Sequence, residues 1–180
     1  MRVVAGRCGG RRLAAPPGQA TRPTSDRVRE ALFSLLGPLD DAVVLDLFAG
    51  SGALGIEALS RGAARATFVD DAPAAIAVVR ANLASLGLEA EAEVRRQDAR
   101  AFLRGARDGR HEYDLVLLDP PYRLAVELGR ELSPLLAEVI APGGRVVAES
   151  DRRAPLDLDL PPTDERRYGD TLIRIHERPQ

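Results

Sequence analysis

Short apolar runs alternate with longer segments of helical spacing along most of this chain, and this alternation limits its fold more than any other feature. Runs of four to six apolar residues suit buried strands, whereas the longer segments suit the helices that connect parallel strands. A chain in which strands and helices alternate builds a mostly parallel sheet covered by helices. The sequence therefore predicts an α/β fold with six or seven strands.

The apolar runs predict six strands, and a seventh is expected as a short partner before the turn at Gly169. The strands are Val43–Leu47, Ala66–Asp70, Glu91–Arg96, Asp114–Asp119, Arg145–Glu149 and Thr171–Glu177, with the short partner at Glu165–Tyr168. Helical spacing and helix-end residues predict five helices. These are Ser25–Leu36 after a Thr24 cap, Ala53–Arg61, Pro73–Leu86, Ala99–Arg107, and Leu124–Ile140 ending before Pro142-Gly143-Gly144.

The length of 180 residues suits about one domain, and 45% hydrophobic residues supply a substantial core. We expect residues 24–180 to form one compact unit without a separate substrate-recognition domain. Residues 1–23 form a basic arm in which Val3–Ala5 and Arg11–Ala14 are expected to pair as a small hairpin. This arm is either docked on the core or mobile until a ligand binds.

Apolar runs and cysteine content indicate the compartment. The longest apolar runs are far shorter than the roughly 18 residues of a membrane span, and the first residues do not form a secretory signal. Cys8 is the only cysteine, so an internal disulfide or a multi-cysteine zinc site is excluded. We expect a monomer in the cytoplasm, with no membrane partner and no metal.

Charge is distributed unevenly, although the net charge is only −2. Residues 1–30 contain seven arginines and two acidic residues, a local charge of +5, and the rest of the chain carries −7. This asymmetry indicates an anion-binding end, for which nucleic acid is the favoured ligand. All 25 basic residues are arginine, which either serves bidentate phosphate contacts or reflects the base composition of the source genome.

A glycine-rich turn between the first strand and its helix is the first candidate site. Gly50-x-Gly52-x-x-Gly55 has the spacing of a nucleotide-binding turn, in which glycines permit close approach of a ligand. Asp70 ends the next strand 18 residues after Gly52, where a carboxylate can accept hydrogen bonds from ribose hydroxyls. Together these features predict a nucleotide-containing cofactor.

Asp46 at the end of the first strand distinguishes two cofactors. Its carboxylate would repel the diphosphate of NAD, whereas S-adenosylmethionine carries an ammonium and a sulfonium and no phosphate. Asp98, after the third strand, can receive the adenine amino group, and Phe48 can face the cofactor. The alternatives are that Asp46 and Asp98 only cap helices or turns and that Phe48 belongs to the core.

The fourth predicted strand ends in Asp119-Pro120-Pro121-Tyr122, at the sheet edge where open α/β folds bind ligands. The exocyclic amine of a base is a poor nucleophile because its lone pair is delocalised into the ring. Oxygens of Asp119 and Pro120 can each accept one amine hydrogen and so favour a pyramidal nitrogen, while the prolines restrict the turn. Tyr122 offers a flat face for an unstacked base. Alternatively, the prolines only end a strand and Tyr122 covers the core.

The sequence does not favour a histidine base, a histidine metal site or a cysteine nucleophile. His111 and His176 are expected at the surface rather than as a base or a metal pair. Cys8 is expected outside the core, in a setting that does not favour a covalent cysteine mechanism.

The glycine turn and Asp119-Pro120-Pro121-Tyr122 resemble the class I S-adenosylmethionine-dependent methyltransferases in their amino-methylating form. Further segments resemble the bacterial family that methylates guanine N2 in 16S ribosomal RNA, and the resemblance covers nearly the whole chain. These segments are Arg2–Arg7, Gly10–Leu13, Thr21–Phe33, Asp46–Gly52 and Tyr168–Thr171. The resemblance implies a Rossmann-like, mostly parallel seven-stranded sheet with helices on both faces, after a small N-terminal hairpin arm.

The resemblance also implies roles for individual residues. For S-adenosylmethionine, it implies that the methionine part is surrounded by Asp46, Phe48, Gly50 and Gly52 and flanked by Thr21–Arg27, with Asp70 at the ribose and Asp98 at the adenine. The target guanine would be held by Asp119, Pro120, Pro121 and Tyr122. The RNA phosphates would lie near Arg7, Arg11, Arg12 and Arg22. Glutamate is the commoner ribose ligand in this fold, so Asp71 competes with Asp70 for that role.

The leading hypothesis is methyl transfer from S-adenosylmethionine to guanine N2 of 16S rRNA, within a small-subunit particle. Methylation of adenine N6 in DNA would use the same four catalytic residues but would need a recognition domain. The remaining alternatives are an NAD-dependent oxidoreductase and a non-enzymatic RNA-binding assembly factor.

Overall fold

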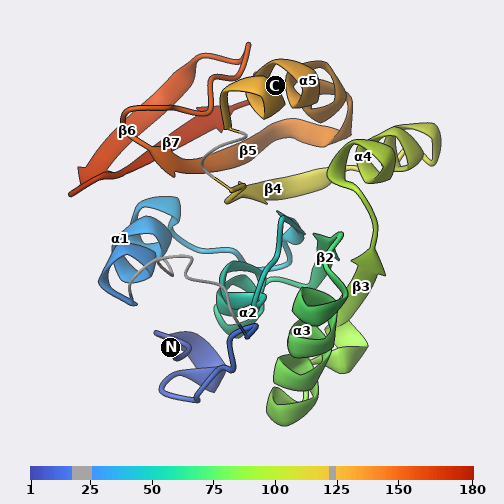
Figure 1. The fold of residues 1–180 in the computed structure, drawn as a ribbon, viewed down its shortest axis with the longest axis vertical. Coiled ribbons are helices and arrows are strands. Elements are labelled where there is room, and N and C mark those ends of the chain that lie inside the picture. The colour runs from blue at the N-terminus through green and yellow to red at the C-terminus, as the bar shows by residue number, and fades with distance from the viewer. Residues whose placement is uncertain (18–25, 122–124) are drawn as a thin grey trace.

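The computed structural model describes residues 1–17, 26–121 and 125–180, and seven strands of these ranges form one sheet (Figure 1). The sheet has the order β3-β2-β1-β4-β5-β7-β6. The strands are β1 Val43–Leu47, β2 Arg65–Asp70, β3 Ala92–Arg96, β4 Tyr113–Leu118, β5 Ile140–Asp151, β6 Pro162–Tyr168 and β7 Thr171–Glu177. Only β7 is antiparallel to its neighbours, so the predicted mostly parallel α/β sheet is confirmed.

In the described ranges, five α-helices and two short 3₁₀ turns accompany the sheet. They are η1 Gly6–Cys8, α1 Asp26–Leu36, α2 Ala53–Ser60, α3 Pro73–Leu86, η2 Glu89–Glu91, α4 Ala99–Asp108 and α5 Ala125–Val139. The predicted helices are confirmed with ends that shift by at most one residue, and the Thr24 cap lies outside the described residues. Helix α3 shows why the ends were predictable, since Pro73 opens it and Gly87 ends it in the left-handed conformation.

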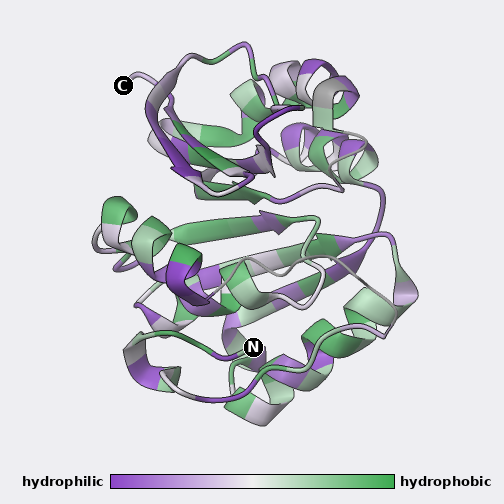
Figure 2. Ribbon diagram, turned by 60° about the vertical axis from the view of Figure 1, so that its left-hand side comes forward, coloured by the Kyte–Doolittle hydropathy of each residue, from purple (hydrophilic) through white to green (hydrophobic). Residues whose placement is uncertain are grey.

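Two apolar clusters lie on opposite faces of the sheet. The N-terminal arm and α1–α3 pack on one face, and α4 and α5 pack on the other. Figure 2 shows the hydrophobic strands of the sheet between helices that carry hydrophilic segments. Strands β1 and β4 lie at the centre and are almost completely buried, whereas edge strand β3 is largely exposed. The carboxyl ends of β1 and β4 therefore meet in the middle of one sheet edge.

The start of β5 differs from the prediction. Helix α5 ends at Val139 and β5 begins at Ile140, so Pro142-Gly143-Gly144 lies inside a strand rather than after a helix. The pairing register with β4 shifts at this point, and Gly143 has a φ of 74°. A Cβ at Gly144 would lie 2.8 Å from the carbonyl oxygen of Ala141, so the glycines accommodate an irregularity that lengthens the strand.

The arm is docked rather than mobile, and its pairing is displaced from the prediction. The Val3 amide donates to the Arg11 carbonyl and the Leu13 amide to the Met1 carbonyl, at 2.9 and 3.1 Å. Gly6–Cys8 forms a 3₁₀ turn between the paired ends. Cys8 was expected outside the core, but it is buried in the same apolar cluster as Val3 and Leu13. A small apolar side chain of this kind is stabilised by burial wherever the chain brings it against the core.

The buried carboxylate of Glu57 in α2 anchors the arm. It accepts the amide hydrogens of Val4 and Ala5 at 2.7 and 3.0 Å, and the Nε hydrogen of Arg61 at 2.7 Å. Further along, the Cys8 amide donates to Ser60 Oγ and the Ala14 amide to Asn82 Oδ1. The arm thus satisfies its backbone donors with side chains of α2 and α3.

We expect Glu57→Gln to lower the free energy of unfolding by about 2–3 kcal/mol, because hydrogen bonds to a buried charged group contribute about 1.5–3 kcal/mol each and the amide nitrogen of Gln would face a donor. Urea unfolding measures this difference. The matched control is Glu138→Gln on α5, where the side chain is 56% exposed and is expected to change stability by less than about 0.5 kcal/mol. Equal stability of the two variants would contradict the anchoring role.

Candidate functional site

The turn after β1 has an unusual backbone that is held against the neighbouring strand by its amides. Phe48, Gly50 and Gly52 have φ values of 72°, 56° and 78°. The amides of Phe48 and Ala49 both donate to the Val69 carbonyl, which ties the turn to β2. A non-glycine residue at positive φ is strained, and such strain concentrates at functional sites.

The three glycines of this turn have different surroundings. A Cβ at Gly55 would lie 2.4 Å from the Phe68 ring, and one at Gly52 would lie 3.3 Å from Val79. Both glycines therefore permit close packing of α2 against β2 and α3. At Gly50, by contrast, the nearest atom among the described residues is the Phe48 carbonyl oxygen at 4.0 Å. The open side of the turn at Gly50 is where a ligand can approach the backbone.

Asp46 is buried within β1 and directed at the start of α2. Its Oδ2 accepts the amide hydrogen of Gly55 at 2.9 Å, so the helix-capping role considered for this residue is present. Burial raises the pKa of Asp46 to about 7, and the nearby Asp70 carboxylate adds to the rise while the Gly55 hydrogen bond opposes it. Within the described ranges Asp46 has no ion-pair partner. A bound cation would therefore be strongly favoured here.

Asp70 braces the glycine turn from the end of β2. Its Oδ2 accepts the Gly50 amide hydrogen and its Oδ1 accepts the Ala72 amide hydrogen, both at 2.9 Å. Each carboxylate oxygen keeps a second lone pair that can accept a hydroxyl hydrogen. Asp71 is exposed. Asp70 is thus the residue held in place beside the turn.

Asp98 lies two strands away from Asp46, after β3, and caps helix α4. Its Oδ1 accepts the Ala101 amide hydrogen at 3.0 Å, and its Oδ2 lies 3.4 Å from Arg100. The side chain is about half exposed, which leaves Oδ2 accessible from solvent. The capping alternative is therefore present for Asp98 as it is for Asp46.

Three carboxyl groups gather at the ends of the central strands. Asp46 pairs in register with Leu117, and Leu117 pairs with Val147, so these residues share one face of the sheet. Asp119 and Glu149 follow two residues after the latter pair and fall on the same face. Burial raises the pKa of Asp119 well above its ordinary value, and the carboxyls of Glu149 and Asp46 raise it further.

The rest of the motif after β4 is partly described. Pro120 is buried and Pro121 is exposed, so the turn emerges from the core at this point. Tyr122 lies outside the described residues, as does Arg22. Glu149 is not among the site residues predicted from the sequence. Its signal is a charged residue that directly follows the apolar run Val146–Ala148 at the carboxyl end of a strand.

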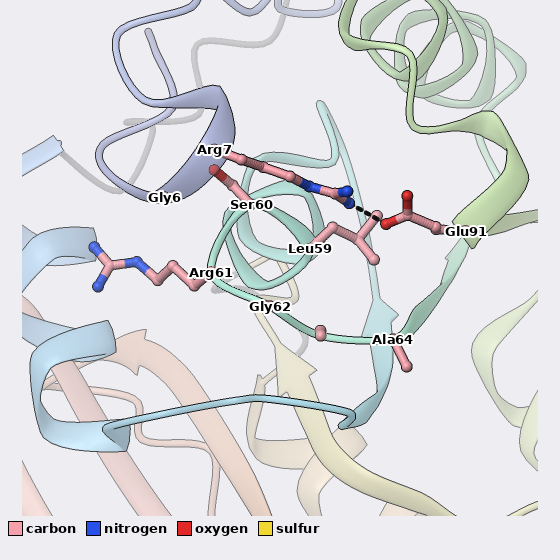
Figure 3. A pocket seen from close by; sticks show the side chains of 9 residues that line it. Gly6, Arg7, Leu59, Ser60, Arg61, Gly62, Ala64 and Glu91 are labelled. Carbon is pink, nitrogen blue, oxygen red and sulfur yellow. Dashed lines mark hydrogen bonds and ion pairs between the residues drawn. The ribbon is translucent and has the colours of Figure 1, made fainter.

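The arm arginines occupy the other side of the molecule. Arg7 forms an ion pair with Glu91, across a hollow of about 490 Å³ that the tip of the arm shares with the end of α2 (Figure 3). Ala64 and Glu91 in its wall precede β2 and β3, so the hollow is at the amino ends of these strands. Arg11 Nη2 donates to the Ser85 carbonyl at 2.5 Å, near the end of α3. Arg7 and Arg11 are therefore at the edge opposite the glycine turn, and both are exposed, as is Arg12.

The two histidines differ from each other. His111 is exposed as expected, but His176 is buried in β7, so the surface assignment was wrong for it. Its Nδ1 lies 2.6 Å from the Leu160 carbonyl, and burial lowers its pKa. His176 is buried because both faces of β7 are covered at this point, as its buried neighbour Ile175 also indicates, and its place near the chain end did not reveal this.

In the described part of the chain, His, Cys, Asp and Glu side chains do not form a group of three or more that could hold a metal. None of the described helices combines the length and apolarity needed to cross a bilayer.

Comparison with known proteins identifies close relatives. The family described as "Conserved hypothetical protein 95" matches residues 1–177. The chain is 41% identical over 187 residues to "Putative rRNA methyltransferase YlbH" of Bacillus subtilis, covering 99% of each. It is 45% identical over 124 residues to "Ribosomal RNA small subunit methyltransferase D" of Escherichia coli K12, covering 68% of this chain and 61% of that protein. A solved structure titled "Putative methyltransferase yhhF from Escherichia coli" superposes with a TM-score of 0.84 at 36% identity, covering 99% of this chain and 98% of the other.

Proposed function

Because this chain belongs to the "Conserved hypothetical protein 95" family, whose relatives carry the name rRNA methyltransferase, we propose that it methylates the exocyclic N2 of a guanine in 16S rRNA with S-adenosylmethionine as methyl donor. At the coarser level, the protein is a methyltransferase of ribosomal RNA. The substrate we propose is 16S rRNA within a small-subunit particle, acted on by a monomer in the cytoplasm.

One observation carries this proposal. The glycine turn after β1 and Asp119-Pro120 after β4 follow adjacent parallel strands, and Asp46 and Asp119 are close enough for one carboxyl to raise the pKa of the other. A cofactor at the turn and an acceptor at Asp119 would therefore meet at one sheet edge. This juxtaposition suits direct transfer between two bound molecules, which depends on positioning more than on a covalent intermediate.

The residues at the turn fit S-adenosylmethionine. Asp46 is a buried carboxyl with a raised pKa and no described cation beside it, so the ammonium of the methionine part would stabilise its charged form. Gly50 leaves the backbone open, Phe48 supplies a partly buried apolar surface, and Asp70 holds spare lone pairs for ribose hydroxyls. Asp98 would serve the adenine amino group through Oδ2. The diphosphate of NAD would meet two carboxylates here, which disfavours it.

Asp119 and Pro120 would prepare the amine for attack. When bound, the cofactor supplies an electrophilic methyl group on a sulfonium. The Asp119 carboxyl and the Pro120 carbonyl each accept one N2 hydrogen, which localises the nitrogen lone pair toward that methyl. Transfer of this methyl group would form an N–C bond and break the C–S bond of the cofactor, and one N2 proton would leave to Asp119 or to water. Tyr122 would stack on the extruded guanine.

Labelled S-adenosylmethionine tests substrate and atom together. The protein is incubated with unmodified 16S RNA, with partly assembled small subunits and with duplex DNA, and the labelled nucleoside is identified after digestion. We expect N2-methylguanosine from RNA or particles. Label in N6-methyladenine of DNA would overturn the substrate, and cofactor binding without transfer to any of the three would favour the assembly-factor alternative.

A further inference from the structure

A second basic hollow lies at the opposite end of the sheet from the arm. It has a volume of about 420 Å³ and is walled by four arginines with one glutamate, on β6, β7 and the segment after β5. The arginines are Arg152, Arg153, Arg167 and Arg174. In Figure 1 the arm lies at the bottom of the molecule and the β6–β7 hairpin at the top, so the two basic regions are far apart.

Asp170 and Glu165 each contact two arginines of this hollow, which leaves several guanidinium N–H donors available. Asp170 lies 3.3 Å from Arg152 and 3.7 Å from Arg153, and Glu165 binds Arg167 at 2.8 Å and Arg174 at 2.9 Å. Each guanidinium has five N–H donors, of which such contacts occupy one or two. The side chains of Arg153 and Arg167 are 71% and 72% exposed, so their free donors face solvent. The hollow therefore offers donors that a planar, doubly bonding anion can use.

The hollow reaches the sheet edge that holds the reaction site, with Arg174 and Glu165 on the sheet face opposite Asp119. Leu118 pairs with Ala148, and Asp119 and Arg152 follow the carboxyl ends of these neighbouring parallel strands. Strand β5 continues to Asp151, which places Arg152 about 13 Å beyond Ala148 along the strand direction, at about 3.3 Å per residue. An RNA whose base enters at Asp119 would bring its flanking phosphates to this edge. By contrast, Arg7 and Arg11 are paired at the other edge.

We propose that the hollow between β5 and the β6–β7 hairpin, with Arg153 and Arg167 at its mouth, binds backbone phosphates of the RNA that delivers the target guanine. The proposal rests on the rRNA substrate argued above. Phosphate contacts here would offset the repulsion that the Asp46, Asp119 and Glu149 carboxyls exert on RNA at this edge. The hollow therefore orients the strand on the side of β5 while the base reaches β4.

The test is a paired substitution that preserves the fold. In Arg153→Gln/Arg167→Gln, Asp170 keeps Arg152 and Glu165 keeps Arg174, so neither carboxylate loses its last arginine. The control is Arg104→Gln/Arg110→Gln, two exposed arginines on α4 and the turn that follows it. A second variant, Arg153→Lys/Arg167→Lys, retains the charges. Affinity for an unmodified 16S RNA transcript is measured over a series of KCl concentrations, and unfolding in urea is measured for every variant.

We expect the Gln pair to weaken RNA binding about five- to tenfold near 100 mM KCl. The magnitude of the negative slope of log K against log[KCl] should fall by about 1–2, because each lost phosphate contact removes roughly 0.7–0.9 from it. The Lys pair should retain most of the slope, and the control pair should match the unchanged protein. A Gln pair with the affinity and slope of the control overturns the proposal, since the arginines would then form only an ion-pair network. Transfer of label to N2-methylguanosine by the unchanged protein would still support the proposed function in that case. A lowered slope without any transfer would reject the function and keep the RNA surface.

Discussion

Replacing Asp119 with alanine is expected to lower kcat for methyl transfer by at least about a thousandfold, because the carboxyl both localises the amine lone pair and positions the base. Affinity for 16S RNA should stay within about twofold, since phosphate contacts dominate that affinity. Single-turnover transfer of labelled methyl measures the first quantity and filter binding the second. The variant should fold, because the substitution removes a carboxyl from a crowded site. In this site, burial and two neighbouring carboxyls raise the pKa of Asp119.

Two further variants identify the cause of the expected loss of methyl transfer in Asp119→Ala. Asp119→Asn keeps an oxygen acceptor but cannot take a proton, so an intermediate rate would separate lone-pair orientation from proton removal. Asp108→Ala on α4, where the side chain is 67% exposed, is the control and should retain full activity. Methyl transfer by Asp119→Ala within tenfold of the unchanged protein would exclude Asp119 from the chemistry.

Replacing Asp46 with asparagine is expected to stabilise the empty protein at pH 8 while weakening cofactor binding. The folded-state pKa of Asp46 is about 7, above the ordinary 3.8, so between these values the folded chain holds a proton that the unfolded chain has lost. Stability of the unchanged protein from this group therefore falls as the pH rises from about 4 to 7 and then levels off. Asparagine lacks this penalty and still offers an oxygen to the Gly55 amide. The gain at pH 8 should be roughly 2–4 kcal/mol, since one pKa unit corresponds to about 1.4 kcal/mol.

The measurements for Asp46→Asn are urea unfolding at several pH values between 5 and 8 and titration with S-adenosylmethionine. The stability difference from the unchanged protein should grow with pH, and the dissociation constant should rise at least about tenfold because a charged partner of the ammonium is lost. Asp108→Asn serves as the control in both measurements. A stability difference that does not change with pH would mean that the Asp46 carboxyl is charged throughout this range.

The sequence predicted the local structure around those candidate-site residues whose positions depend on neighbouring residues in the chain. Asp46, Gly50 and Gly52 could be selected because a strand that runs directly into a glycine turn has few alternative structures. The order of strands and helices followed from periodicity, and the helix ends at Pro73 and Gly87 followed from local backbone preferences. These signals lie within a few residues of the structure that they specify.

Features that depend on distant packing were not predictable from the sequence. Cys8 is buried because the arm packs on one face of the sheet, and His176 is buried where β7 meets the segment around Leu160. The residues next to Cys8 and His176 in the sequence do not indicate either contact. The Pro142-Gly143-Gly144 run is typical of the end of a helix, but in the structure it lies within β5, which pairs with the neighbouring β4. Glu149 is placed beside Asp119 by the pairing register of β5 with β4. The sequence of one strand alone does not specify that register.

The anchors of the arm determine when it can dock during synthesis. Val4 and Ala5 bind Glu57, and Ala14 binds Asn82, which lies 68 residues later in the chain. At elongation rates of about 5–20 residues per second, roughly 3–14 s pass between the synthesis of Ala14 and that of Asn82. During this interval the arginines of the arm are free of Glu91 and Ser85, which are themselves still to be made. The arm is thus made before its partners and can reach its final place only after Asn82 has been made.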